Sequence, residues 1–163
     1  ESFIQRYNSD LANDFGNLLS RVTTLIKKNY DGVIPEPGEL NDLDLVIKEK
    51  GIALSKLVHG LVDEMRLNDA IEEIMQFIRM VNKYMEENAP WKLVKEDKVA
   101  AGKILYIAGE ALRLGAVLLS PIMPNRSATL LNTLNVQGKS LSWGGLEPGR
   151  GLKDHEPLFP RIK

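Results

Sequence analysis

The residues of this chain best suited to chemistry stand at a break in a helical pattern. One of only two tryptophans, Trp91, follows Pro90 directly in the stretch EENAPWKLV. The proline stiffens the backbone there. An aromatic ring held at a helix end is suited to stacking on an unpaired nucleobase, which is worth about 1–3 kcal/mol per base. The alternative is that Trp91 caps the hydrophobic core where the helix stops, and the chemistry of the stretch leaves both interpretations open.

A second set of polar residues recurs on one face of the first helical segment. Asn13, Asn17 and Arg21 are four positions apart, so they rise along a single face beside the apolar stripe. Asparagine and arginine both form directional hydrogen bonds to base edges or phosphates. The same spacing fits a hydrated face on which Arg21 pairs with Asp14 or Asp10. The polar neighbours on this segment are Asp10, Asp14 and Thr24.

Residues typical of a catalytic or metal centre are scarce. The chain has no cysteine, and its two histidines, His59 and His155, are far apart in sequence. These residues do not provide the spacing of a zinc site. We expect His59 to be a partly buried helix residue. The motifs alone therefore favour a binding or structural module without a catalytic residue, a metal or a cofactor of its own.

Composition narrows the function classes further. The chain has 163 residues and a net charge of -1, which excludes nucleic-acid binding by bulk charge but leaves room for a few placed contacts. Its apolar runs are too short to span a membrane, and no signal peptide is visible. These features favour the cytoplasm. The first residue is Glu rather than Met, so we expect a piece of a longer protein.

In the segments that must position these residues, apolar side chains recur with a helical period. The first helix should end near Asn29 before the loop YDGVIPEPG, and its inward stripe is Leu11, Phe15, Leu18, Val22 and Leu25. A second helix is expected from about Asn41 to Met65, although Gly51 and Gly60 weaken this prediction. Its predicted inward residues are Leu45, Ile52, Leu57 and Leu61.

Three more helices follow in the pattern. Asn68 is the expected N-cap of a third helix that stops before Pro90, a fourth runs from about Lys98 to Leu119, and a short fifth covers 126–134. The predicted fold is all-α: an antiparallel bundle of about five helices over about 1–140, with an extended tail over about 141–163. The stretch SLSW could form a brief strand. We expect one domain covering 1–163.

Several stretches together resemble a known family. YNSDLANDFGNLLSR followed by YDGVIPEP is similar to the start of the anticodon-binding domain of methionyl-tRNA synthetase, and so are NKYMEENAPWKL, SPIMP and the terminal PLFPRIK. The resemblance covers nearly the whole chain in the right order. Class I synthetases for leucine, isoleucine and valine share the first-helix pattern, but the proline–tryptophan pair and the closing LFPRI favour the methionyl enzyme.

The resemblance implies roles for the residues already described. In that family the asparagine and arginine of the GNLLSR segment contact the anticodon, and the tryptophan after proline stacks on an anticodon base. Here these are Asn17, Arg21 and Trp91, with Asn13 and Pro90 as adjacent candidates. The implied partners are the anticodon loop of the methionine tRNA and the catalytic domain of the same parent chain, with no role for DNA or a membrane.

The motifs that mark the catalytic half of enzymes in that family are absent from this sequence. Neither a HIGH-like nor a KMSKS-like motif occurs in the sequence, so the fragment alone should not activate methionine, whereas the parent ligase would use ATP with magnesium. Two alternatives stay open. The chain could be the same domain of another class I synthetase, or a helical protein-interaction module that uses the Asn17/Arg21 face and Trp91 to bind a protein partner.

Overall fold

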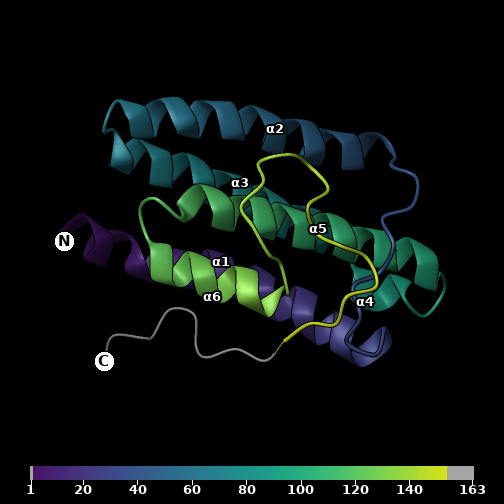
Figure 1. Ribbon diagram of the computed structural model, residues 1–163. Helices are drawn as coiled ribbons and strands as arrows, with labels where there is room; N and C mark the ends of the chain where they lie inside the picture. Colours follow the sequence, from purple (N-terminus) through teal and green to yellow (C-terminus); the bar gives the residue numbers. More distant parts are fainter. Residues whose placement is uncertain (1, 154–163) are drawn as a thin grey trace.

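The computed structural model describes the backbone of residues 2–153 and the side chains of residues 9–153. The five longer helices are α1 (Ser2–Asn29), α2 (Asp42–Asp63), α3 (Leu67–Asn88), α5 (Lys98–Leu119) and α6 (Pro124–Thr133), and a single turn, α4 (Pro90–Leu93), follows α3. Figure 1 shows them packed as an antiparallel bundle. The predicted all-α class is therefore confirmed. The terminal PLFPRIK and His155 lie outside the described residues.

Helix α5 forms the centre of the bundle because its sequence is apolar almost all round. Eighteen of its 22 residues are buried, and it packs against α1, α2, α3, α4 and α6. A helix without a polar face must be covered on every side. Its predicted bounds, 98–119, and all six residues expected to be inward are confirmed: Ile104, Ile107, Ala108, Ala111, Leu112 and Leu118.

Helix α1 has the orientation that its apolar stripe predicts. Leu11, Phe15, Leu18 and Val22 are buried in the core, and each such side chain stabilises the fold by roughly 1.5–3 kcal/mol. Leu25 is partly buried against the same core. With this stripe turned toward α3 and α5, the row of Asn13, Asn17 and Arg21 lies at the edge of the buried face.

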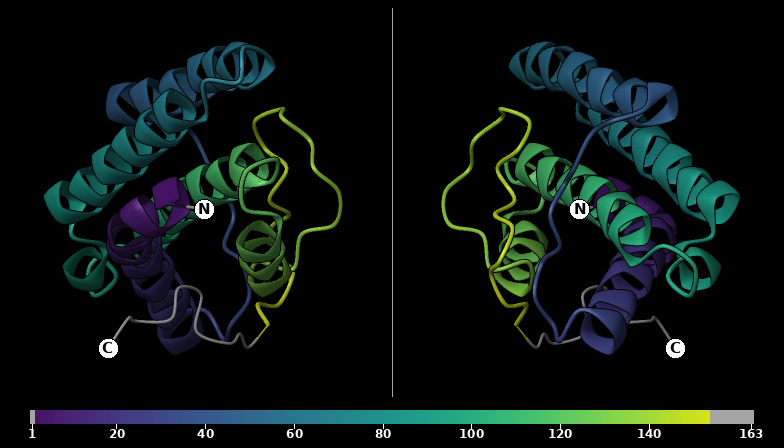
Figure 2. Two further views of the ribbon diagram at one scale, coloured as in Figure 1. Left: turned by 90° about the vertical axis from the view of Figure 1, so that its left-hand side faces the viewer. Right: turned by 90° about the vertical axis from the view of Figure 1, so that its right-hand side faces the viewer.

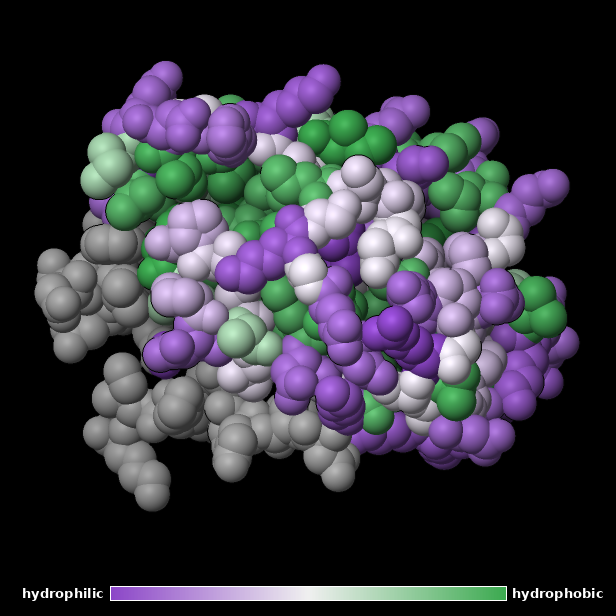
Figure 3. All heavy atoms as spheres, in the orientation of Figure 1, coloured by the Kyte–Doolittle hydropathy of each residue, from purple (hydrophilic) through white to green (hydrophobic). Residues whose placement is uncertain are grey.

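The predicted inward face of α2 is wrong in three of four positions. Leu61 is buried, but Leu45, Ile52 and Leu57 are 39%, 40% and 47% exposed. The face that packs consists of Asp44, Ile47, Gly51, Leu54, Ser55, Val58 and Leu61. Figure 3 shows the resulting hydrophobic side chains at the surface along its upper edge, over α2. The helix carries apolar residues on two faces, so its period alone does not select the buried one.

The start of α3 also differs from the prediction. Its N-cap residue is Arg66, which makes no side-chain cap, and Asn68 lies within the first turn. The last turn of α2 explains this early start, because the Arg66 amide donates to the Leu61 carbonyl at 2.8 Å. Only three residues then separate α2 from α3, and Met65 takes a left-handed φ of 60° between them.

The segment after α6 crosses the outside of the bundle. Figures 1 and 2 show residues 135–150 passing over α5 toward α2 and returning toward the 31–34 loop. There Ile34 and Arg150 are joined by an amide–carbonyl bond of 2.8 Å, and Val33 and Gly151 form an isolated β-bridge. Within 2–153 this bridge is the only β pairing, so the brief strand expected at SLSW is not formed.

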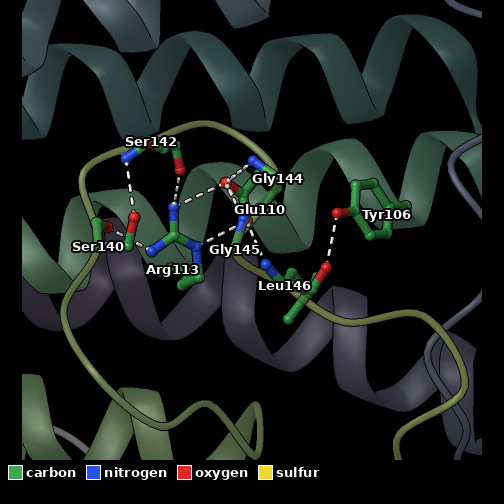
Figure 4. Close-up of polar contacts among 8 residues, drawn as sticks. All are labelled: Tyr106, Glu110, Arg113, Ser140, Ser142, Gly144, Gly145 and Leu146. Atoms are coloured by element: carbon green, nitrogen blue, oxygen red, sulfur yellow. Dashed lines mark hydrogen bonds and ion pairs between the residues drawn. The ribbon is translucent and has the colours of Figure 1, made fainter.

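A buried ion pair on α5 holds this segment in place. Arg113 donates through Nε and Nη2 to both carboxylate oxygens of Glu110 at 2.7 and 2.8 Å, and both side chains are at most 1% exposed. Glu110 also accepts the amides of Gly144, Gly145 and Leu146, while Arg113 donates to the carbonyls of Ser140 and Ser142 (Figure 4). The pair thus satisfies five backbone groups of a segment that has no secondary structure of its own. We call this arrangement the Glu110–Arg113 clasp.

Candidate nucleic-acid interface

The polar row of α1 leads toward the end of the bundle where α4 lies. Asn13 and Asn17 are exposed, and Arg21, one turn further, is partly buried. In Figures 1 and 2 the C-terminal half of α1 runs beside α4. The residues of this row are four positions apart and border the buried stripe. The row therefore runs along α1 toward Trp91, at the start of α4.

The backbone before Trp91 is fixed by an abrupt helix end. Helix α3 stops at Asn88, and Ala89 takes a left-handed conformation (φ 43°, ψ 63°) that caps it, its amide donating to the Met85 carbonyl at 2.8 Å. Pro90 then opens α4 and is itself buried. The next side chain, Trp91, is partly exposed. The other tryptophan, Trp143, packs against the hydrophobic core cluster. Among the described residues, Trp91 is not part of that cluster.

Arg21 and Trp91 meet although α1 and α4 are far apart in sequence. The guanidinium carbon of Arg21 lies 5.9 Å from the centre of the Trp91 ring, within the range of a cation–π interaction. A surface hollow opens beside this contact, lined by Ser20, Arg21, Thr24, Leu25 and Trp91. The geometry thus combines an aromatic platform, a cation and polar side chains at one open site.

The partner of Arg21 is a residue that the sequence interpretation did not consider. Arg21 Nη2 lies 3.4 Å from Glu86 Oε2, and the two side chains are 30% and 64% exposed. An ion pair this long and this exposed contributes little to stability. It leaves the guanidinium able to exchange Glu86 for another anion.

Asp14, one of the two carboxylates that the hydrated-face alternative offered as a partner of Arg21, pairs with Arg79 on α3 instead. The Arg79 Nε–Asp14 Oδ2 distance is 2.8 Å, and Asn82 donates to the Asp14 backbone carbonyl at 3.1 Å. Burial raises the pKa of Asp14, although the Arg79 charge opposes this shift. The pairing with Arg21 does not form because α3 packs along α1 and supplies partners that lie far away in the sequence.

The residues missed by sequence reasoning lie within one turn of those that were found. Leu25 follows Arg21 by four positions, and Ser20 precedes Thr24 by four, so helical spacing could have added both to the surface that Arg21 and Thr24 share. Glu86 gives a weaker signal, five residues before Trp91, because its approach to Arg21 depends on how α3 packs on α1.

Other kinds of site find no support in the described part of the chain. Among the side chains described, those of residues 9–153, no group of three or more His, Asp or Glu is placed to hold a metal ion. His59, expected to be partly buried, has a side chain that is 73% exposed and lies 3.3 Å from Asp63. None of the helices described between residues 2 and 153 combines the length and hydrophobicity needed to cross a membrane.

Comparison with known proteins gives a consistent picture. Residues 34–162 match the family model described as the anticodon binding domain of methionyl tRNA ligase. Over 99% of its length the chain is 38% identical to the methionine–tRNA ligase of Caldanaerobacter subterraneus subsp. tengcongensis, and over 97% it is 39% identical to that of Deinococcus radiodurans. It spans 26% and 24% of these relatives, that is, about a quarter of their length.

A solved structure shares the fold. The free-state methionyl-tRNA synthetase of Mycobacterium tuberculosis superposes with a TM-score of 0.88 at 32% identity, over 98% of this chain and 34% of that one. The segment that carries Asn13, Asn17 and Arg21 precedes the residues matched by the family model, but the coverage of the relatives includes it.

Proposed function

Since the chain belongs to the family of the anticodon-binding domain of methionyl-tRNA ligase, we propose that it recognises the anticodon loop of the methionine tRNA. It does so as one domain, residues 1–163, of a longer ligase. That parent protein attaches methionine to its tRNA in the cytoplasm with ATP and magnesium. The chain spans only about a quarter of its curated relatives, so the catalytic domain and its cofactors belong to the remainder.

The proposal assigns a role to each residue of the site. Trp91 stacks on an unpaired anticodon base, and Arg21 binds a base edge or a phosphate beside it. Asn17, exposed one turn earlier on α1, reads a base edge through its amide, which both donates and accepts hydrogen bonds. Asn13 extends the row by another turn. Pro90 is buried, so its role is to fix the backbone that presents Trp91 rather than to touch RNA.

The observation that carries the proposal is the 5.9 Å approach of Arg21 to the Trp91 ring at an open hollow. Single-stranded RNA is read by stacking on aromatic side chains together with hydrogen bonds to the unstacked bases. A site of this kind needs only a few placed residues. It therefore agrees with a net charge of -1, which would not support binding through a broad basic surface.

The proposal also limits what the chain does by itself. Without the HIGH-like and KMSKS-like motifs, it should bind RNA but should not catalyse methionine-dependent exchange of pyrophosphate into ATP. Robust exchange by the pure 163-residue chain, at a rate independent of contaminating ligase, would contradict this division of labour.

The experiment that tests the proposal is a titration with two kinds of anticodon stem-loop. One carries the methionine anticodon CAU, and the other carries an anticodon whose first base is changed. We expect the chain to prefer CAU. Asn17→Ala should lower that preference, and Arg21→Ala should lower affinity with a smaller salt dependence if its partner is a phosphate. Equal and weak binding of all stem-loops, unchanged by either substitution, would instead favour the protein-interaction module.

A further inference from the structure

The hollow beside Trp91 contains two hydroxyl side chains with no assigned role. Ser20 and Thr24 line it together with Arg21, Leu25 and Trp91. Both hydroxyl residues are exposed. Thr24 lies three positions beyond Arg21 and four beyond Ser20, so helical geometry places the two hydroxyls on one face and Thr24 beside the guanidinium.

These two hydroxyls differ from most of the serines and threonines of the helical bundle whose side chains the structure describes; Ser9, nearer the start of α1, is the exception. A hydroxyl in a helix commonly donates to a backbone carbonyl one turn earlier, and Thr23, between the two, does so to Leu19 at 2.8 Å. The same kind of backbone bond is made by Ser55, Ser120, Thr129 and Thr133, and the hydroxyl of Ser127 on α6 donates instead to the Ala116 carbonyl on α5 at 2.6 Å. Among the described residues, neither Ser20 nor Thr24 has a hydrogen bond of this kind. Their hydroxyl protons are therefore available to a ligand in the hollow.

The charge of the hollow indicates the class of ligand. Arg21 is the one ionised side chain among the five that line it. Glu86 contacts the Arg21 guanidinium but does not line the hollow. A concave site with one cation, two hydroxyl donors and no lining carboxylate suits an anionic group, and hydroxyl side chains are frequent phosphate ligands in nucleic-acid complexes.

We propose that the hydroxyls of Ser20 and Thr24 bind a backbone phosphate of the RNA, that of the nucleotide whose base stacks on Trp91. The inference rests on the proposed function and deepens it. The two hydroxyls donate to non-bridging phosphate oxygens beside the Arg21 guanidinium, so that base and phosphate of one nucleotide are held from two sides. Ser20 and Thr24 are positioning residues, because a rotating hydroxyl can donate or accept and distinguishes bases poorly.

The test compares Ser20→Ala and Thr24→Val with Thr129→Val in the 163-residue chain. Thr129 lies on α6, which packs on α5, and serves as the matched control for losing a helical hydroxyl. We expect Ser20→Ala and Thr24→Val each to weaken stem-loop binding about three- to tenfold. The loss should be the same for CAU and for a changed first base, and Thr129→Val should have no effect. A loss confined to CAU, or no loss at all, would overturn the proposal.

A second arm identifies the phosphate directly. Stem-loops carrying a neutral methylphosphonate at each loop linkage in turn are titrated with the wild-type chain and with Thr24→Val. At one linkage the neutral group should weaken wild-type binding, and Thr24→Val should then cause less than about a twofold further loss, because the two changes remove one interaction. If the affinity losses caused by the methylphosphonate and by Thr24→Val multiplied at every linkage, a hydroxyl–phosphate contact would be contradicted.

The outcomes separate this inference from the proposed function. If the wild-type chain prefers CAU while Ser20→Ala and Thr24→Val bind normally, the phosphate subsite is wrong and anticodon recognition stands. If the wild-type chain shows no preference among stem-loops, the proposed function fails and the subsite fails with it. Circular dichroism of each variant checks that the helical fold is retained.

Discussion

The Arg21 guanidinium lies between Glu86 and the Trp91 ring, 3.4 Å from the carboxylate oxygen and 5.9 Å from the ring centre. Three elements, α1, α3 and α4, therefore meet through the side chain of one arginine. The carboxylate contacts the cation beside the ring, so in the proposed RNA complex a phosphate or base edge would compete with it. On the proposed function, we therefore expect Glu86 to modulate the affinity of the site.

We first predict that Glu86→Gln strengthens RNA binding. Removing the carboxylate frees Arg21 and takes away a negative charge that repels the RNA backbone, so affinity for stem-loops should rise about two- to tenfold at low salt, with the gain shrinking as salt is added. Stability should change by less than about 0.5 kcal/mol because the pair is exposed. Titrations at two salt concentrations measure both effects.

The neighbouring Glu87 provides the control. It is exposed on the same turn of α3, and Glu87→Gln removes the same charge without touching Arg21. If Glu87→Gln raised affinity as much as Glu86→Gln, the gain would be due to net charge alone, and the specific role of the Arg21–Glu86 pair would be refuted.

How far the fold follows from the sequence depends on how one-sided each helix is. The bounds of α5 were predicted because the segment is apolar until the prolines after Leu119. Asp97, whose carboxylate accepts the Ala100 amide at 3.1 Å as an N-cap, is a further start signal that the prediction did not use. The buried face of α2 was not predicted, because it includes Asp44, Gly51 and Ser55. Their burial depends on partners from α3, α5 and the 140–146 segment, which no local pattern contains.

The candidate site divides in the same way. Residues on one helix face, such as Asn13, Asn17 and Arg21, could be grouped by spacing, and the pairing of Pro90 with Trp91 marked the platform. The approach of Arg21 to Trp91 and to Glu86 could not be derived, since both depend on how α1 packs against α3 and α4. The Glu110–Arg113 clasp was also missed, although two charged residues within an apolar helix are an available signal.

The two glycines of α2 should respond to alanine differently. A Cβ on Gly60 would meet nothing within 4 Å, so Gly60→Ala should stabilise the helix by up to about 1 kcal/mol. A Cβ on Gly51 would approach side-chain atoms of Leu114, Trp143 and Phe77 at 3.1–3.3 Å, so Gly51→Ala should be less stable than Gly60→Ala by about 1 kcal/mol or more. Urea unfolding of both variants tests this, and equal stabilisation would refute the close packing at Gly51.

Breaking the Glu110–Arg113 clasp should cost far more than removing a surface pair. Glu110→Ala leaves Arg113 buried without its counter-charge and strands three backbone amides, so we expect a loss of about 3–5 kcal/mol. Burial raises the pKa of Tyr106 to about 12, and the negative charge of Glu110 is the second-largest cause of this rise. The matched comparison is Glu147→Ala, whose exposed pair with Arg150 should contribute less than about 1 kcal/mol. Similar melting temperatures for the two variants would contradict the clasp.

A pH-dependent contribution to stability should come from Asp44. Burial alone would raise the pKa of Asp44, but hydrogen bonds from Lys103, Tyr84 and the Asn41 amide outweigh it and lower the pKa below its ordinary 3.8. A lowered folded-state pKa gives stability that is present above 3.8 and is lost as the pH falls through the folded value. Asp44→Asn should therefore lower the free energy of unfolding by about 2 kcal/mol at pH 7. The gap between the variant and the wild type should narrow below pH 3.8 in urea titrations, and a gap that stays constant down to pH 2 would refute the assignment.

The central claim is that Trp91 is a stacking platform rather than a cap on the core, and the Trp91→Ala variant tests it most directly. The measurement is the affinity of the folded chain for a CAU stem-loop, taken together with the melting temperature. The account predicts that binding weakens by roughly 1–3 kcal/mol while the melting temperature changes little, because Trp91 is partly exposed and lies outside the core cluster. A sharp fall in melting temperature, with affinity per folded molecule unchanged, would show that Trp91 caps the core and would contradict the account.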